Sequence, residues 1–340
     1  ISHNVSLIAL LAAGFGLALV LGLIAARLRM PPLVGYLLTG VMIGPGTPGF
    51  VGDVALSGQL AEIGVMLLMF GVGLHFSMAD LLAVRRIAVP GAVVQIGAAT
   101  LLGGGLALGW GWPVGDAVVF GLSLSVASTM VLLRALEARG NLESTNGRIA
   151  VGWLVVEDLA MVLVLVLLPV LGAKSSAATA ELGGLALTVG LTLAKVSAFI
   201  ALMLIGGRWA FPRLLWLVAK SGSRELFTLC VVAAAVGVAY CAAILFDVSF
   251  ALGAFFAGMM MRESEFSHRA ADESLPLRDA FSVLFFVSVG MLFDPTILVT
   301  SPGKVVAVLA VILVGKTVAA IALVLAFRYP LNTALTMGAS

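Results

Sequence analysis

The chain has 340 residues, of which 61% are hydrophobic and 11% are charged, and its formal net charge is +2. Soluble domains carry about 25% charged residues, and the mean hydropathy of this chain is +1.18. This composition excludes an ordinary soluble domain, and the small net charge gives no indication of nucleic-acid binding. We therefore predict an all-α polytopic membrane protein.

Apolar runs long enough to cross a membrane follow one another along the whole chain. About 20 residues, rising 1.5 Å each, are needed for one crossing. Two of the runs, 32–50 and 248–262, look short or interrupted by glycine and proline. The predicted helices cover residues 6–26, 32–50, 56–75, 87–110, 114–136, 148–171, 184–206, 223–245, 248–262, 277–293 and 304–327, and a twelfth begins near Leu331.

The distribution of lysine and arginine predicts the orientation in the membrane, because cytoplasmic loops carry an excess of both. With the N-terminus outside, the inside loops hold all but four of the 19 basic residues. The outside loops hold Lys174 and Lys304, while Lys195 and Lys316 fall within predicted helices. The inside residues are Arg27, Arg29, Arg85, Arg86, Arg134, Arg139, Arg148, Arg208, Arg213, Lys220, Arg224, Arg262, Arg269, Arg278 and Arg328. We therefore predict an outside N-terminus.

Two parts of the chain resemble each other at a nearly constant spacing. The matched pairs are Val72/Val289, Gly73/Gly290, Phe76/Phe293 and Glu62/Asp279 at an offset of 217, and Val34/Val248, Leu38/Leu252 and Gly44/Gly258 at an offset of 214. The predicted helix 87–110 maps onto 304–327. By helix parity the second copy enters the membrane from the opposite side, so the pattern predicts an inverted-topology repeat, which is typical of secondary transporters.

The repeat also predicts helices that the chain does not complete. The partner of helix 114–136 should lie at about 331–353, and the partner of helix 148–171 near 365–388. We therefore expect thirteen helices in the intact protein, of which about 11–12 are present here. We also expect the chain to be truncated within the second copy and the intact protein to have a cytoplasmic C-terminus.

Two adjacent carboxylates, Glu157 and Asp158, lie in the otherwise apolar segment 151–169. Charges at membrane depth are costly and usually handle an ion or a proton. Consecutive helical residues point about 100° apart, so one carboxylate can meet Lys316 while the other faces a cavity. That second carboxylate could exchange a proton for a cation, because burial and nearby cations act on its pKa in opposite directions. A purely structural ion pair is the alternative interpretation.

The predicted helix 114–136 contains a polar, small-residue stretch with Ser125, Ser128 and Thr129. Such residues weaken a helix midway and allow backbone carbonyls to turn toward a cation, although they are equally common at helix packing contacts. Lys195, midway along helix 184–206, has no obvious partner in the sequence. We interpret it as an accessory residue that pairs with a carboxylate or extends toward the membrane surface.

These residues resemble the cation:proton antiporter-2 family, and most closely its Kef-type and YbaL-like members. The resembling stretches are spread over essentially the whole chain and are specific in combination. They are Pro32-Leu-Val-Gly-Tyr-Leu-Leu-Thr-Gly40, Leu67-Leu-Met-Phe-Gly-Val-Gly-Leu74, Val156-Glu-Asp-Leu159, Ser249-Phe-Ala-Leu-Gly-Ala-Phe-Phe-Ala-Gly258 with Glu263-Ser-Glu-Phe-Ser-His268, and Leu284-Phe-Phe-Val-Ser-Val-Gly-Met291.

The resemblance implies an inner-membrane homodimer with the sodium/proton-antiporter-like fold, which exchanges K⁺ or Na⁺ for H⁺ by elevator-like alternating access. It implies that residues 1–75 and 223–293 are mainly scaffold and dimer interface. Residues 87–171 and 304–340 would then mainly form the ion-binding core.

The resemblance also implies roles for individual residues. Asp158 would bind the monovalent cation or the proton, Glu157 and Lys316 would balance charge, and Ser125, Ser128 and Thr129 would lie on the first of two broken helices. Sodium-linked relatives carry Asp-Asp and potassium-linked ones often Gln-Asp, so Glu157-Asp158 departs from both patterns. Relatives often append a cytoplasmic nucleotide-binding regulatory domain, whose Gly-rich fingerprint is absent from this sequence, so we expect no regulatory domain and no cofactor in this chain.

Other classes of function make different demands on the sequence. A gated cation channel would need a filter of repeated carbonyls, and no such motif is seen. A sodium-coupled symporter of an organic solute would need a roomier cavity without a central lysine. An intramembrane hydrolase would need membrane-embedded catalytic groups, whereas His3, His75 and His268 lie at helix ends or in loops. We therefore predict a transporter and not an enzyme.

Overall fold

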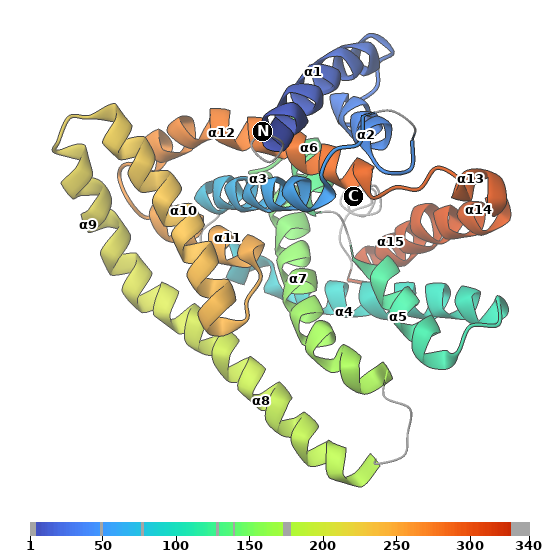
Figure 1. Cartoon of the computed structure of the whole chain (residues 1–340). Helices are drawn as coiled ribbons and strands as arrows, with labels where there is room; N and C mark the ends of the chain where they lie inside the picture. The colour runs from blue at the N-terminus through green and yellow to red at the C-terminus, as the bar shows by residue number, and fades with distance from the viewer. Residues whose placement is uncertain are drawn as a thin grey trace. The chain divides into compact units, whose positions relative to one another are not determined.

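The computed structural model describes residues 5–47, 50–75, 78–126, 129–138, 140–172 and 178–327. In these ranges all regular secondary structure is helical (Figure 1). The elements are α1 (Val5–Arg27), α2 (Pro32–Ile43), α3 (Val54–His75), α4 (Met78–Gly109), α5 (Val114–Ser125), α6 (Thr129–Ala138), α7 (Thr145–Gly172), α8 (Ala178–Leu202), the π-helix η1 (Met203–Gly207), α9 (Arg208–Ala219), α10 (Arg224–Phe246), α11 (Phe250–Arg262), α12 (Ser267–Met291), α13 (Ile297–Thr300), α14 (Pro302–Ala310), the π-helix η2 (Val311–Lys316) and α15 (Thr317–Ala326).

Several helix starts follow directly from the local sequence. Asp53 caps α3, because its Oδ1 accepts hydrogen bonds from the backbone N–H groups of Ala55 and Leu56 at 2.9 and 3.1 Å. Ser144 caps α7 in the same way, and Ser223 accepts from Leu226 at the start of α10. These side chains satisfy N–H groups that have no partner within the first turn of a helix.

Seven helices in the described ranges are long and apolar enough to cross a membrane. They cover Ser6–Arg27, Val54–His75, Leu82–Gly109, Gly190–Ala219, Arg224–Phe246, Ser267–Met291 and Pro302–Ala326. Three shorter apolar helices, α2, α5 and α11, accompany them. The all-α, multi-pass membrane protein predicted from the sequence is therefore confirmed.

Several helices differ in their bounds from the prediction. Helix α4 begins at Met78 and α12 at Ser267, each more than two turns before the predicted start, because their first turns are too polar to count as apolar runs. Helix α2 ends at Ile43 because Gly44 is extended, with ψ 167°. Helix α8 continues through η1 into α9 without a non-helical residue (Figure 1). The expected helix from Leu331 lies outside the described residues.

The chain divides into two compact units, which we call unit 1 and unit 2. Unit 1 comprises residues 1–74, 203–243 and 253–302, and unit 2 comprises residues 75–202, 244–252 and 303–340. The scaffold and ion-binding roles expected for the chain segments stay predictions.

In unit 1, helices cross where glycine faces glycine. A Cβ on Gly290 of α12 would lie 2.9 Å from the Cα of Gly40 on α2. A Cβ on Gly258 of α11 would lie 3.0 Å from the Cα of Gly73 on α3. In the predicted repeat, Gly73 matches Gly290 and Gly44 matches Gly258. The two crossings use matching residues if Gly258 is instead paired with Gly40, which lies one helical turn before Gly44. These contacts explain why small residues recur in both segments, since any side chain would separate the backbones.

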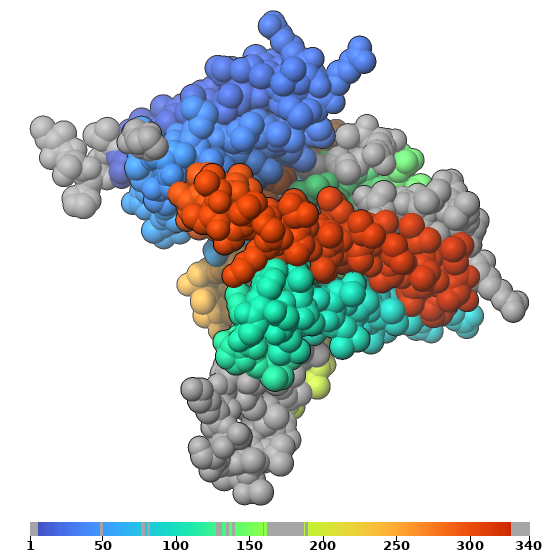
Figure 2. All heavy atoms as spheres, turned by 90° about the vertical axis from the view of Figure 1, so that its right-hand side faces the viewer, coloured from blue at the N-terminus to red at the C-terminus, as the bar shows by residue number. Residues whose placement is uncertain are grey.

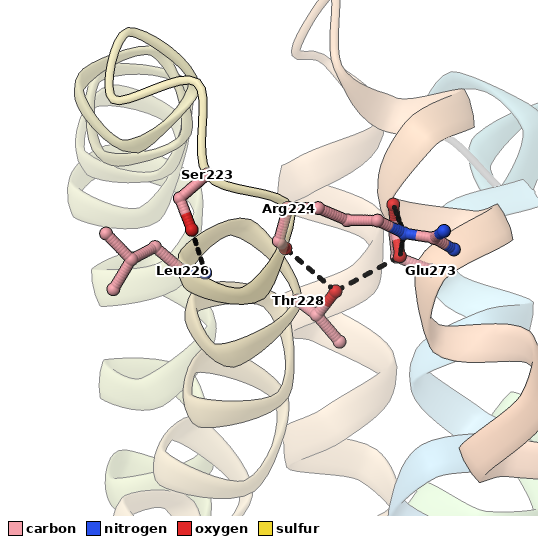
Figure 3. A network of polar contacts seen from close by, with 5 residues as sticks. All are labelled: Ser223, Arg224, Leu226, Thr228 and Glu273. Atoms are coloured by element: carbon pink, nitrogen blue, oxygen red, sulfur yellow. Dashed lines mark hydrogen bonds and ion pairs between the residues drawn. The ribbon is translucent and has the colours of Figure 1, made fainter.

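A second packing contact in unit 1 is polar. The Nε–H of Arg224 at the start of α10 is shared between the two carboxylate oxygens of Glu273 on α12, each 2.9 Å from Nε, and the Thr228 hydroxyl lies 3.1 Å from Oε2 of Glu273 (Figure 3). The Thr228 hydroxyl also lies 3.1 Å from the backbone carbonyl of Arg224. One carboxylate thus ties the first turns of α10 to α12.

In unit 2, α4 packs against α5 and α7 and also contacts η2 and α15. Figure 2 shows the red surface of the 302–326 segment beside the blue-green surface of α5. A Cβ on Gly121 of α5 would lie 2.9 Å from the backbone nitrogen of Gly104 on α4. Gly121 thus lets the backbones of α4 and α5 approach closely.

Candidate functional site

Helix α7 of unit 2 carries the acidic pair, and its two carboxylates differ in burial. Glu157 is only 2% exposed, whereas Asp158 is intermediate. This agrees with the expectation that consecutive residues face different surroundings. Both residues take part in polar or electrostatic interactions.

The carboxylate of Glu157 has a defined partner on its own helix. The indole Nε1–H of Trp153, one turn earlier, donates a hydrogen bond to Glu157 Oε1 at 3.1 Å. Trp153 is itself 2% exposed. Sequence reasoning missed this tryptophan, although its spacing of four residues from a buried acid on one helix face was a usable signal.

The predicted interruption of helix 114–136 is present in the structure. Helix α5 ends at Ser125, Val126 is extended with φ −63° and ψ 123°, and α6 begins at Thr129. The Ser125 hydroxyl donates to the carbonyl of Leu122 at 2.6 Å, and the residue is 0% exposed. Ser128 and the side chain of Thr129 lie outside the described part of the chain.

The backbone carbonyl of Ser125 lies at the C-terminal end of α5, where helical carbonyls lose their regular partners. Nζ of Lys316 donates a hydrogen bond to this carbonyl at 2.9 Å. A cation is favoured at this end of a helix because the helix dipole is negative there. The charge of Glu157 also acts on Lys316. The lysine therefore joins η2 to the end of the broken helix, through a main-chain contact that sequence alone could not specify.

Lys316 is the last residue of the π-helix η2, within the span Pro302–Ala326. Single π-turns inside α-helices occur frequently at functional sites, because the extra residue changes the direction of the side chains. The predicted charge balance between Glu157 and Lys316 stays a prediction.

Lys195 has a different environment from the one around Glu157. Its Nζ pairs with Asp247 Oδ2 at 2.5 Å, and the two side chains are 46% and 62% exposed. Asp247 follows α10 and has a positive φ of 54°, a conformation that aspartate tolerates better than most residues. Sequence reasoning left Lys195 without a named partner because Asp247 lies 52 residues away in a turn. The accessory role of Lys195 stays a prediction.

A family model described as the transmembrane sodium/hydrogen exchanger matches residues 15–340 of the chain. The chain belongs to the sodium/hydrogen exchanger family. The resemblance to cation/proton antiporters that the sequence motifs indicated is thereby confirmed.

Relatives of this exchanger-family chain carry names of the same kind. A protein of Escherichia coli (strain K12) named "Putative cation/proton antiporter YbaL" is 58% identical over 99% of this chain. K(+) efflux antiporter 4 of Arabidopsis thaliana is 34% identical over 94% of it. The chain spans 61% of the length of the first relative and 53% of the second. Relatives named as antiporters agree with the prediction of a transporter and not an enzyme.

A solved structure of the sodium proton antiporter MjNhaP1 from Methanocaldococcus jannaschii resembles this exchanger-family chain in fold. The TM-score is 0.68 at 16% identity, over 97% of this chain and 80% of that one. The sodium/proton-antiporter-like fold class predicted from the sequence is confirmed by this likeness.

Proposed function

We propose that this chain is the membrane domain of an antiporter that exchanges a monovalent cation, with K⁺ favoured over Na⁺, for H⁺. The observation that carries the proposal is the pair Glu157 and Asp158 in the otherwise apolar segment 151–169 of α7, together with Lys316 in the span Pro302–Ala326. The names of the relatives support antiport, and K(+) efflux antiporter 4 supports potassium as the cation.

The chemistry of exchange rests on a single carboxylate that holds either a proton or a cation, but not both. We assign this role to Asp158, which is the less buried acid of the pair. A site of intermediate burial can lose its water shell on closing and regain it on opening. No cofactor is needed, because the two ions are the substrates.

Charge balance is the second element of the proposal. A buried carboxylate without a nearby cation is expensive, and Lys316 supplies such a cation near Glu157. We assign to Glu157 and Lys316 the task of keeping the region neutral while the occupant of Asp158 changes. Without that balance, each exchange would leave a net charge in a region of low dielectric constant.

The two glycine crossings of unit 1 support an inverted repeat, because α2 on α12 and α11 on α3 use corresponding residues once Gly40 is paired with Gly258. In transporters with inverted repeats, one repeat moves against the other, so that the binding site opens alternately to the two sides of the membrane. We therefore propose elevator-like alternating access in a homodimer of the inner membrane with the N-terminus outside. A cytoplasmic nucleotide-binding domain in the intact protein belongs to the same proposal.

The test is proton flux in proteoliposomes of the intact protein, challenged in turn with K⁺, Na⁺ and Li⁺. We expect cation-triggered proton movement that is strongest with K⁺ and is lost in Asp158→Asn. Asp116→Asn, the same chemical change at the exposed start of α5, is the matched control and should transport normally. Normal flux in Asp158→Asn would remove the site assignment, and cation flux without proton movement would indicate a channel.

A further inference from the structure

The hydrogen bond between Trp153 and Glu157 joins two side chains that are both buried on α7. The indole donates from Nε1 to Oε1 at 3.1 Å, across one turn of α7. Both residues are 2% exposed. Tryptophan buries more apolar area than other residues, and its N–H needs a partner once it is buried. Here that partner is a carboxylate, so the hydrogen bond is of the stronger, charge-assisted kind.

The indole is held from the other side by a glycine. A Cβ placed on Gly91 of α4 would lie 2.5 Å from Cε3 and 2.6 Å from Cη2 of the Trp153 ring. Even a methyl group at residue 91 would therefore displace the ring. Gly91 follows Pro90, which already removes one hydrogen bond from the α4 backbone. Gly91 of α4 thus leaves a space for the indole, which we call the slot at Gly91. A side chain at residue 91 would occupy this space.

We propose that Trp153 is a positioning residue, which fixes the carboxylate of Glu157 from the slot at Gly91 and thereby sets the affinity of the neighbouring cation site. This inference rests on the proposed antiport function. The indole does not touch the cation. It holds one oxygen of Glu157, so that the charge of this residue stays in one place relative to Lys316 and to Asp158, the next residue on the helix.

The contact itself is tested without any transport measurement. In ¹⁵N-tryptophan-labelled intact protein, the indole N–H signal of Trp153 is assigned by its loss in Trp153→Phe. A hydrogen bond to a carboxylate moves an indole proton to low field, so Glu157→Leu should move this signal back to high field. Gly97→Ala, on α4 like Gly91 but with nothing within 4 Å of the new methyl group, should leave it unchanged. An unchanged signal in Glu157→Leu would overturn the proposal.

The role in transport is tested by separating affinity from maximal rate. We expect Trp153→Phe and Gly91→Ala each to raise the half-saturating K⁺ concentration about tenfold, the size expected for one hydrogen bond to a charged group. Their maximal rates should remain within a factor of two to three of the wild type. Gly97→Ala should match the wild type in both quantities.

The double variant Gly91→Ala/Trp153→Phe distinguishes positioning from packing. A phenyl ring is smaller than an indole, so the methyl group at residue 91 fits beside it and thermal stability should recover relative to Gly91→Ala. The donor is still absent, so the half-saturating concentration should stay raised. Wild-type affinity in this double variant would overturn positioning and leave packing as the role of Trp153.

The same experiments separate this proposal from the proposed function. If the wild type shows no cation-dependent proton flux, antiport fails, and positioning for transport fails with it. The Glu157→Leu shift in the indole signal would then still stand as a structural contact. If antiport and its loss in Asp158→Asn are observed while Trp153→Phe has wild-type affinity, only the positioning role is overturned.

Discussion

Some helices cross where glycine meets glycine in both units, but unit 2 also holds the buried carboxylate of Glu157 and the lysine Lys316. The buried hydroxyl of Thr39 in unit 1 donates to a carbonyl of its own helix, at Gly35, and Ser282 does the same at Arg278. In unit 2, Lys316 reaches a carbonyl on another helix, at Ser125. Unit 1 thus satisfies these polar groups locally and packs backbone against backbone.

The difference shows that small residues and helix breaks serve two separate purposes in this membrane chain. In unit 1 the glycines leave the helices unbroken and remove the space between them. In unit 2 the break after α5 and the π-turn η2 leave carbonyls and a lysine that are not committed to regular helix pairing. A site that changes its occupant needs such groups, because carbonyls released from helix pairing can accept a cation.

The largest effect on stability is expected from filling a crossing in unit 1. In Gly258→Ala the new Cβ would meet the carbonyl of Phe70 and would lie 3.0 Å from the Cα of Gly73 and from the nitrogen of Leu74. These are backbone atoms, which cannot turn away as a side chain can, so the helices must separate. We expect a loss of about 3 kcal/mol, at the upper end of typical overpacking costs, measured as a lower thermal midpoint in detergent.

Gly16→Ala on α1 is the control for this variant, because nothing lies within 4 Å of its new methyl group. Its midpoint should equal that of the wild type or exceed it slightly, since alanine favours helix. Equal midpoints for Gly258→Ala and Gly16→Ala would mean that the crossing in unit 1 is not tight.

A smaller effect on stability, but a large one on transport, is expected in unit 2 from Lys316→Met. Methionine keeps much of the length and removes the charge, so the Ser125 carbonyl loses its donor. One buried polar group without a partner costs about 2 kcal/mol. Proton flux should fall at least tenfold, because Glu157 loses its nearby cation.

Ser125→Ala provides the matched comparison, because Lys316 binds the main chain of this residue and not its hydroxyl. The expected loss is under about 1 kcal/mol, with flux close to the wild type. If Ser125→Ala were as harmful as Lys316→Met, the side chain and not the carbonyl would be the functional group.

The sequence predicted those parts of the molecule that follow from one-dimensional patterns. Apolar runs located the spans, and the cost of burying charge located Glu157 and Asp158. The weak stretch around Ser125 located the interruption between α5 and α6. Polar first turns, as in α4 and α12, carry no hydropathy signal, so those starts were placed too late.

The contacts of the site could not be predicted for a different reason. Lys316 binds a backbone carbonyl, and every residue has one, so no residue type marks the partner. The slot at Gly91 is visible only once α4 and α7 are packed together. The sequence therefore predicts which residues carry charge, and the packing determines which atoms those charges meet.

The smallest effect is expected for the exposed ion pair of unit 2, Lys195 with Asp247. Exposed pairs contribute little, because water screens the charges and two long side chains must be held in place. A double-mutant cycle of Lys195→Met and Asp247→Asn should give a coupling of about 0.5 kcal/mol. The coupling should shrink further in 1 M salt, where the screening length is only about 3 Å.

Transport by Lys195→Met decides between a surface ion pair and the accessory role expected from the sequence. A surface pair predicts that the half-saturating K⁺ concentration and the maximal rate both match the wild type, in contrast to Lys316→Met. An accessory role predicts a change in one of them that Asp247→Asn reproduces, because either substitution breaks the same contact. If the accessory role is found, burial does not distinguish functional from structural charges in unit 2, because the side chains of this pair are 46% and 62% exposed.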